Sequence, residues 1–168
     1  MENPSKKSKI EEFKTNVQKL KDDVIQSIES IKEQSSIDLT IDDVDLDAEV
    51  LRIPKIYSKY LNLYTDQSIT LKDLMVYKDK IKMERWKYYS GKQTEKYQAE
   101  HGVMHEKVIK SDIDMYLASD EKYSLISDLV NTQKIYVDMI EKVMKEVTNK
   151  NFHIKCAIEW RKFAAGVF

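Results

Sequence analysis

The sequence predicts an all-α protein. Only 3 Gly and 2 Pro occur in 168 residues, so few positions interrupt a helix. Charged residues make up 34% of the chain, and apolar residues mostly recur at spacings of three and four, as on one face of a helix. At 108–118 polar and apolar residues partly alternate, so a short strand or an extended segment competes with helix there.

Residues 1–36 are predicted to form an amphipathic, coiled-coil-like helix. Its apolar positions follow an a/d heptad register, with Ser27 filling one gap. Because the stripe is narrow, the helix could dock on its own chain or pair with a partner helix, and both interpretations stay open. The stripe consists of Ile10, Phe13, Val17, Leu20, Val24 and Ile31.

Residues 37–53 form a predicted acidic linker. Residues 1–53 carry 8 Lys and Arg against 13 Asp and Glu, whereas residues 54–168 carry 20 against 16. A solvated linker and an acidic-apolar recognition segment both fit this pattern. A carboxylate metal site fits poorly, because a calcium loop needs a glycine turn and a bidentate Glu at fixed spacing.

The region 54–118 is expected to hold two helices and a loop. Pro54 suits the first position of a helix, where its missing N–H costs nothing. We expect that helix to stop at 65–68 and a second to run from about Leu71 to Tyr89, with Gly91 as its stop. The polar residues 92–107 are expected to form a loop.

Residues 119–168 are predicted to form a C-terminal helical hairpin. Ser119 is the expected cap of a long helix with an apolar stripe from Ile126 to Val147. The polar run 148–151 is expected to form a turn, with a last helix ending at Gly166. Two helices joined by a short polar turn form an antiparallel hairpin.

The most distinctive stretch is 78–92, which combines basic and aromatic residues. It carries six of the chain's 28 Lys and Arg. Basic side chains neutralise phosphates, and aromatic rings stack on unpaired bases, so the combination indicates single strands rather than a duplex groove. A solvated helix whose rings belong to the core is the competing interpretation. The candidate nucleic-acid-binding residues are Lys78, Lys80, Lys82, Arg85, Lys87, Tyr88, Tyr89 and Lys92.

Enzymatic and metal-binding patterns are weak. The chain has no phosphate-binding glycine loop and no Gly-x-Ser-x-Gly motif, so we predict no catalytic residue and no cofactor. The pairs His101/His105 and His153/Cys156 lack further ligands nearby, so we predict no metal site. The single Cys156 cannot form an internal disulfide, which suits a reducing cytosol, and no apolar run is long enough to span a membrane.

Several short motifs resemble the UvsY recombination mediator family of T4-like bacteriophages. They are Tyr57-Ser58-Lys59-Tyr60-Leu61-Asn62, Arg85 followed by Tyr88-Tyr89-Ser90-Gly91, Lys110-Ser111-Asp112 with Leu117 and Asp120, and Phe152-x-Ile154-Lys155 followed by Arg161-x-Phe163-x-Ala165-Gly166. The resemblance covers roughly 40–166. The family's Lys-x-Arg motif is only half present, because Met83 stands where the family has lysine. Lys82 or Lys87 could replace it.

The resemblance implies a non-enzymatic protein that binds single-stranded DNA in the cytoplasm of the infected host. It implies two protein partners, the phage strand-exchange recombinase and the phage single-strand-binding protein. It also implies that the protein assembles with further copies of itself into a hexameric or heptameric ring, and that it does not bind a membrane. The alternative is a coiled-coil scaffold that binds no nucleic acid. In the ring interpretation, the C-terminal helices would assemble through Leu129, Val130, Val137, Ile140, Val143 and Ile158.

Overall fold

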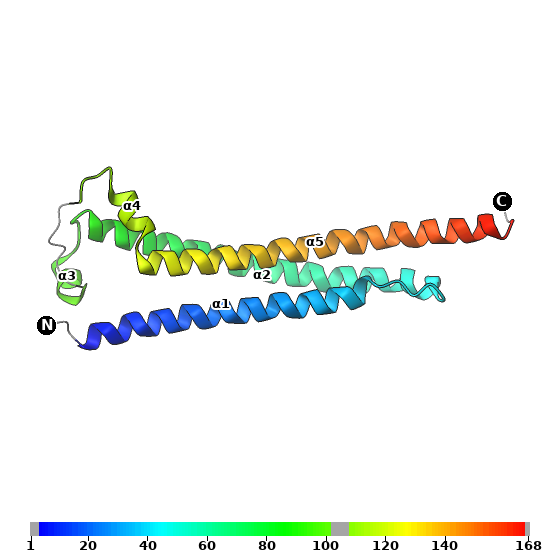
Figure 1. The fold of residues 1–168 in the computed structure, drawn as a ribbon, viewed down its shortest axis with the longest axis horizontal. Helices are drawn as coiled ribbons and strands as arrows, with labels where there is room; N and C mark the ends of the chain where they lie inside the picture. The colour runs from blue at the N-terminus through cyan, green and yellow to red at the C-terminus, as the bar shows by residue number, and fades with distance from the viewer. Residues whose placement is uncertain (1–3, 102–107, 167–168) are drawn as a thin grey trace. The chain divides into compact units, whose positions relative to one another are not determined.

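A computed structural model of the chain describes residues 4–101 and 108–166 and confirms the all-α fold. Three long helices are α1 (Pro4–Leu39), α2 (Leu46–Tyr89) and α5 (Glu121–Ala164). Two short helices, α3 (Glu95–His101) and α4 (Ile113–Ala118), lie between α2 and α5 in the sequence (Figure 1). Within the described ranges no helix combines the length and apolar content needed to cross a bilayer.

The contacts of the chain divide it into two units. The first unit comprises Met1–Val24 and Thr70–Gln133, and the second comprises Ile25–Ile69 and Lys134–Phe168. Each of the three long helices contributes one segment to each unit.

The first unit has a core formed by segments of α1, α2 and α5. Its buried centre consists of Val17, Ile81, Ile126 and Leu129, and Phe13 is among the half-buried residues packed against it. Ion pairs flank this core, with Lys14 2.6 Å from Glu121 and Lys21 2.5 Å from Asp128. This part of the N-terminal helix therefore docks on its own chain, although Leu20 in the predicted stripe is exposed.

The predicted acidic linker 37–53 is wrong in its boundaries. α1 continues to Leu39 and α2 already begins at Leu46, so only six residues connect them. Asp45 caps α2, because its side chain accepts a hydrogen bond from the Ala48 N–H at 3.0 Å. Pro54 is therefore not the first residue of a helix. It lies inside α2, and the helix buries residues on both sides of it, among them Leu46 at its start and Ile56.

Two predicted breaks are also wrong. α2 passes through 65–68 without interruption, and the Thr65 hydroxyl donates to the Leu61 carbonyl at 2.9 Å, as helical Thr side chains do. α5 passes through 148–151, so the predicted hairpin is a single helix. Val147, Lys150 and Ile154 are all buried on one face of α5 across the expected turn.

Smaller corrections concern the segments between α2 and α5. The expected loop 92–107 contains α3, and its residues 102–107 lie outside the described part of the chain. The ambiguous segment 108–118 is a turn followed by α4, which buries Ile113 and Leu117 four residues apart. Asp120, rather than Ser119, caps α5, because its carboxylate accepts the Tyr123 N–H at 3.1 Å.

In the second unit, a buried lysine stabilises the end of α1. The Lys150 ammonium donates to the carbonyls of Asp38 and Thr40 at 3.0 and 2.8 Å and lies 2.5 Å from Glu49. The side chains of Lys150 and Glu49 are only 2% and 4% exposed, respectively. Lys150 thus binds carbonyls at the C-terminal end of α1 from a neighbouring helix and neutralises a buried carboxylate of α2.

Asp38 is the second anchor of this region. It accepts hydrogen bonds from Lys59 at 2.7 Å and from the Tyr60 hydroxyl at 2.9 Å. Burial raises the pKa of Asp38, but these hydrogen bonds and the Lys59 charge outweigh it and hold the pKa below 3.8. The charged form of Asp38 therefore stabilises the fold.

We predict that Lys150→Met lowers the free energy of unfolding by about 3 kcal/mol, because Glu49 then stays buried with only the half-exposed Arg52 as its partner. Urea denaturation followed by circular dichroism measures the change. Lys142→Met, an exposed lysine of the same helix, is the matched control and should leave the urea midpoint unchanged. Equal midpoints for both variants would contradict the role of Lys150.

A second prediction concerns acid pH. Since the folded-state pKa of Asp38 is lowered, its stabilisation is present above 3.8 and is lost as pH falls through the folded-state pKa. Asp38→Asn should therefore be less stable than the parent chain at pH 6, and the difference in urea midpoint should shrink below about pH 4. A difference that is constant from pH 6 to pH 3 would show that the Asp38 charge contributes nothing.

Candidate nucleic-acid interface

The basic-aromatic stretch forms the last turns of α2 and the tight turn that follows, all in the first unit. The Lys92 N–H donates to the Lys87 carbonyl at 3.0 Å, and the Gly91 N–H donates to the Tyr88 carbonyl at 3.2 Å. This pair of hydrogen bonds is a Schellman motif, which needs a left-handed residue, and Gly91 supplies it with φ 69°. The predicted end of the helix is correct.

Most of the candidate lysines are exposed. Lys80, Lys82, Lys87 and Lys92 project into solvent, and Lys78 is half-buried. By the helical period, Lys80 and Lys87 lie on the opposite side of α2 from Arg85. The sequence also predicted a shared face made of Lys78, Lys82, Arg85 and Tyr89. This face is not one exposed surface, because Arg85 and Tyr89 turn toward the interior of the unit.

Arg85 is held in an ion pair rather than displayed. Its Nε lies 2.6 Å from Oδ2 of Asp120, and the two side chains are 14% and 5% exposed. The guanidinium also lies 4.5 Å from the Tyr88 ring centroid and 5.3 Å from that of Tyr89. Burial lowers the pKa of Arg85, but its hydrogen bonds to Tyr89, Asp120 and Tyr97 and the Asp120 charge outweigh this effect and raise it.

Asp120 connects three structural features. Its Oδ2 accepts hydrogen bonds from Arg85 and from the Tyr89 hydroxyl, the latter at 2.7 Å. Its Oδ1 accepts a hydrogen bond from the Tyr123 N–H and so caps α5. Burial, followed by the hydrogen bond to Asp120, raises the pKa of Tyr89. The end of α2 is thereby fixed to the beginning of α5.

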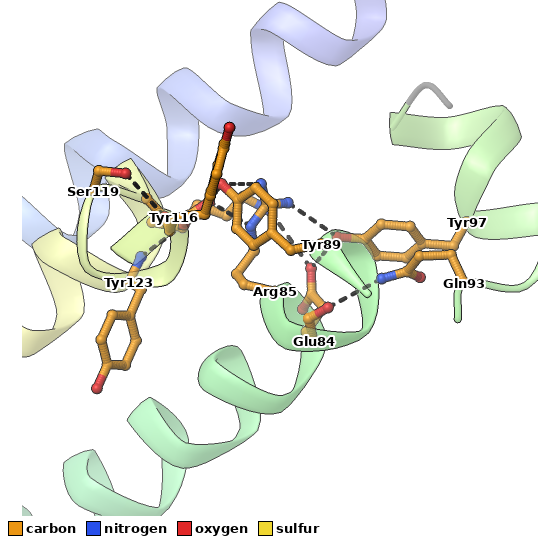
Figure 2. A network of polar contacts seen from close by, with 10 residues as sticks. Glu84, Arg85, Tyr89, Gln93, Tyr97, Tyr116, Ser119 and Tyr123 are labelled. Carbon is orange, nitrogen blue, oxygen red and sulfur yellow. Dashed lines mark hydrogen bonds and ion pairs between the residues drawn. The ribbon is translucent and has the colours of Figure 1, made fainter. Parts of the chain in front are cut away.

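Tyr97 of α3 extends the network on its other side. Its hydroxyl donates to Glu84 at 2.7 Å and lies 3.4 Å from Arg85 Nη1 (Figure 2). Gln93 donates to the Glu84 carbonyl at 3.0 Å, which holds the segment after Gly91 against α2. Burial and the hydrogen bond to Glu84 raise the pKa of Tyr97, so this hydroxyl stays protonated as a donor near neutral pH.

The aromatic rings form a half-buried cluster around the guanidinium. Tyr88 packs edge-on against Tyr89 with ring centroids 5.3 Å apart, and Tyr116 of α4 lies 5.6 Å from Tyr89. Trp86 is also half-buried, and the Lys92 ammonium lies 5.0 Å from its ring centroid. The half-buried Trp86 ring thus lies beside the exposed Lys92, and a ring beside a lysine is the chemistry that binding of unpaired bases needs.

The sequence alone did not indicate that Asp120 and Glu84 hold these residues. Asp120 is 35 residues from Arg85, so no helical spacing connects them. One local signal was available for Asp120, since Asp is a preferred residue immediately before a helix.

The candidate assembly residues lie inside the chain. In the first unit Leu129 and Val130 are buried, and in the second Val137, Ile140 and Val143 are buried. Ile158 is half-buried. The first five residues therefore stabilise the fold of a single chain.

Metal-binding groups do not gather in the described ranges. No cluster of three or more His, Cys, Asp or Glu there has an arrangement that could hold a metal ion. His153 and Cys156 are exposed on α5. The His101 side chain and His105 lie outside the described residues.

The all-helical fold and the basic, aromatic end of α2 define the class of this protein, a helical protein with a candidate surface for nucleic acid. The family model described as "Recombination, repair and ssDNA binding protein UvsY" matches residues 34–167, so the chain belongs to the UvsY family. No curated protein matched the chain.

Solved structures agree on the fold. The crystal structure of the bacteriophage T4 recombination mediator protein UvsY in lattice type II has a TM-score of 0.74 and 22% identity, and the match covers 82% of this chain and 96% of that one. The crystal structure of the same protein in lattice type I has a TM-score of 0.73 and 21% identity, and the match covers 80% of this chain and 98% of that one. The family match begins at residue 34, so most of α1 precedes it.

Proposed function

We propose that this protein is a recombination mediator that binds single-stranded DNA through the end of α2. The observation that carries the proposal is that the exposed lysines Lys80, Lys82, Lys87 and Lys92 share the end of α2 and its turn with the half-buried rings of Trp86 and Tyr88, with Lys92 in contact with the Trp86 ring. Lysines supply affinity without sequence preference, and rings restrict the ligand to unpaired bases. Membership of a family described by recombination, repair and ssDNA binding supports the same ligand.

The protein would act as a mediator by binding one DNA strand at several such sites at once. A ring of six or seven subunits would present one basic helix end from each subunit and raise affinity through multivalency. A strand bound at many points would bend, which weakens the grip of the phage single-strand-binding protein and presents the strand to the strand-exchange recombinase. This activity needs no catalytic group, and we place it in the cytoplasm of the infected host.

We propose a different assembly surface from the one that the sequence predicted. On α5 in the second unit, Phe152, Cys156 and Trp160 follow one another at four-residue spacing, and Phe163 continues the same face. All four are exposed, Trp160 by 70%, and the rings of Trp160 and Phe163 lie 5.8 Å apart. An exposed aromatic stripe of this kind marks a contact with another protein surface.

The DNA-binding proposal predicts a change in salt dependence. Lys80→Ala combined with Lys87→Ala should weaken binding of a labelled dT oligonucleotide and reduce the slope of log K against log salt by about 0.7 for each phosphate that is no longer neutralised. Fluorescence anisotropy across a NaCl series measures both quantities. Lys142→Ala with Lys155→Ala removes the same charge from α5 and should leave the slope unchanged.

A parent chain that shows no salt-sensitive binding at micromolar concentration would instead support a scaffold that binds no nucleic acid.

The assembly proposal predicts a change in mass. Trp160→Ala combined with Phe163→Ala should shift the particle toward monomer in sedimentation velocity, whereas Ile135→Ala, an exposed apolar residue elsewhere on α5, should not. Because assembly supplies multivalency, DNA affinity should fall with the mass.

Cys156 gives an independent measurement. It lies within the stripe and is the only cysteine, so its alkylation by a maleimide should be slow in the assembled parent and fast in the double variant. An unchanged mass together with fast alkylation in the parent would exclude this surface.

A further inference from the structure

Arg85, one of the residues that the sequence predicts for the DNA site, is held in an ion pair within the protein. Arg85 bonds Asp120 at 2.6 Å, and the rings of Tyr88 and Tyr89 lie next to its guanidinium. The Tyr89 and Tyr97 hydroxyls lie at 3.5 and 3.4 Å, at the edge of hydrogen-bonding distance. The Arg85 side chain is only 14% exposed, so little of it is available to a DNA phosphate while these contacts hold.

Both carboxylate oxygens of Asp120, the partner of Arg85, already accept hydrogen bonds. Asp120 uses one carboxylate oxygen for Arg85 and Tyr89 and the other for the N-terminal turn of α5. If Arg85 swung out to a phosphate, Asp120 would remain buried as an uncompensated charge, which is strongly unfavourable. Lys82 and Lys87 lie on neighbouring turns of the same helix and are exposed, so they can neutralise phosphates without that loss.

We propose that Arg85 is a positioning residue for DNA binding and does not contact phosphate. It acts through Asp120, Tyr88 and Tyr89, fixing the last turn of α2 and the orientation of its rings for DNA binding. This inference rests on the proposed binding of single-stranded DNA at this site.

The inference can be tested by the direction of one effect. Asp120→Asn makes each subunit more positive by one charge and weakens the hold on Arg85. If Arg85 were a phosphate ligand, this variant would release it and bind DNA more tightly. If Arg85 positions the site, Asp120→Asn loosens the end of α2 and binds DNA more weakly despite the added positive charge.

The experiment measures anisotropy of a labelled dT oligonucleotide across a NaCl series. We compare the full-length parent, Arg85→Ala, Asp120→Asn and the double variant, each confirmed by circular dichroism to keep its helicity and by sedimentation to keep its assembly state. We expect each single variant to raise Kd by about tenfold, and the double variant to raise it no further, because both act through one ion pair. The salt slope should stay at the parent value.

Tyr89→Phe serves as the mild variant should the others lose helicity. It removes the hydroxyl bonded to Asp120 and keeps the ring, so it should weaken binding with an unchanged salt slope. Lys87→Ala is the control for a phosphate-binding lysine and should reduce the slope by about 0.7.

Tighter binding by Asp120→Asn, or a reduced slope for Arg85→Ala with additive effects in the double variant, would overturn the inference. Should Asp120→Asn unfold, Tyr89→Phe decides the matter, and binding equal to that of the parent would overturn the inference. Absence of DNA binding by the parent would instead overturn the proposed function.

Discussion

The buried ion pair between Arg85 and Asp120 is the constraint on which the candidate site depends. Asp120 begins α5 and Arg85 lies one turn before the end of α2, so a single carboxylate joins two helices far apart in the sequence. An ion pair removed from water is favourable only when its remaining hydrogen-bonding groups are satisfied. Tyr89 and Tyr97 meet part of that requirement, which explains why tyrosines surround this charge.

The second unit also contains a buried ion pair, between Lys150 and Glu49. Lys150 joins α5 to the carbonyls at the end of α1 and to Glu49 of α2, so the connection between these two helices needs only six residues. The continuity of α5 through 148–151 comes from the burial of apolar side chains on both sides of Lys150. Thr and Asn lower helix stability by only about 0.7 kcal/mol per residue, whereas each fully buried apolar side chain contributes about 1.5–3 kcal/mol. Val147 and Ile154 therefore decide the local structure.

The fold class was predictable from sequence because helix-breaking residues are scarce throughout the chain. Composition shows this scarcity without any knowledge of tertiary contacts. The boundaries at Pro54, 65–68 and 148–151 were not predictable. At Pro54 and at 148–151 buried neighbours on the same helix override local propensity, whereas α2 passes through 65–68 without a buried residue there. The location of the basic-aromatic stretch at the end of α2 was likewise predictable from charge and from Gly91. The division of its residues into exposed and internally paired groups depends on Asp120, which local spacing cannot reveal.

This division is also compatible with the methionine at position 83, where the resemblance to the family predicts a lysine. Met83 is exposed, and its neighbours on the helix surface at three and four residues' distance are Lys80 and Lys87. Neutralising phosphates demands charge near the strand and tolerates displacement by one turn, because the interaction is not directional. The ion pair between Arg85 and Asp120 tolerates no such displacement, since it requires hydrogen bonds at defined atoms. A lysine can therefore move along this helix, whereas Arg85 is tied to its position by Asp120.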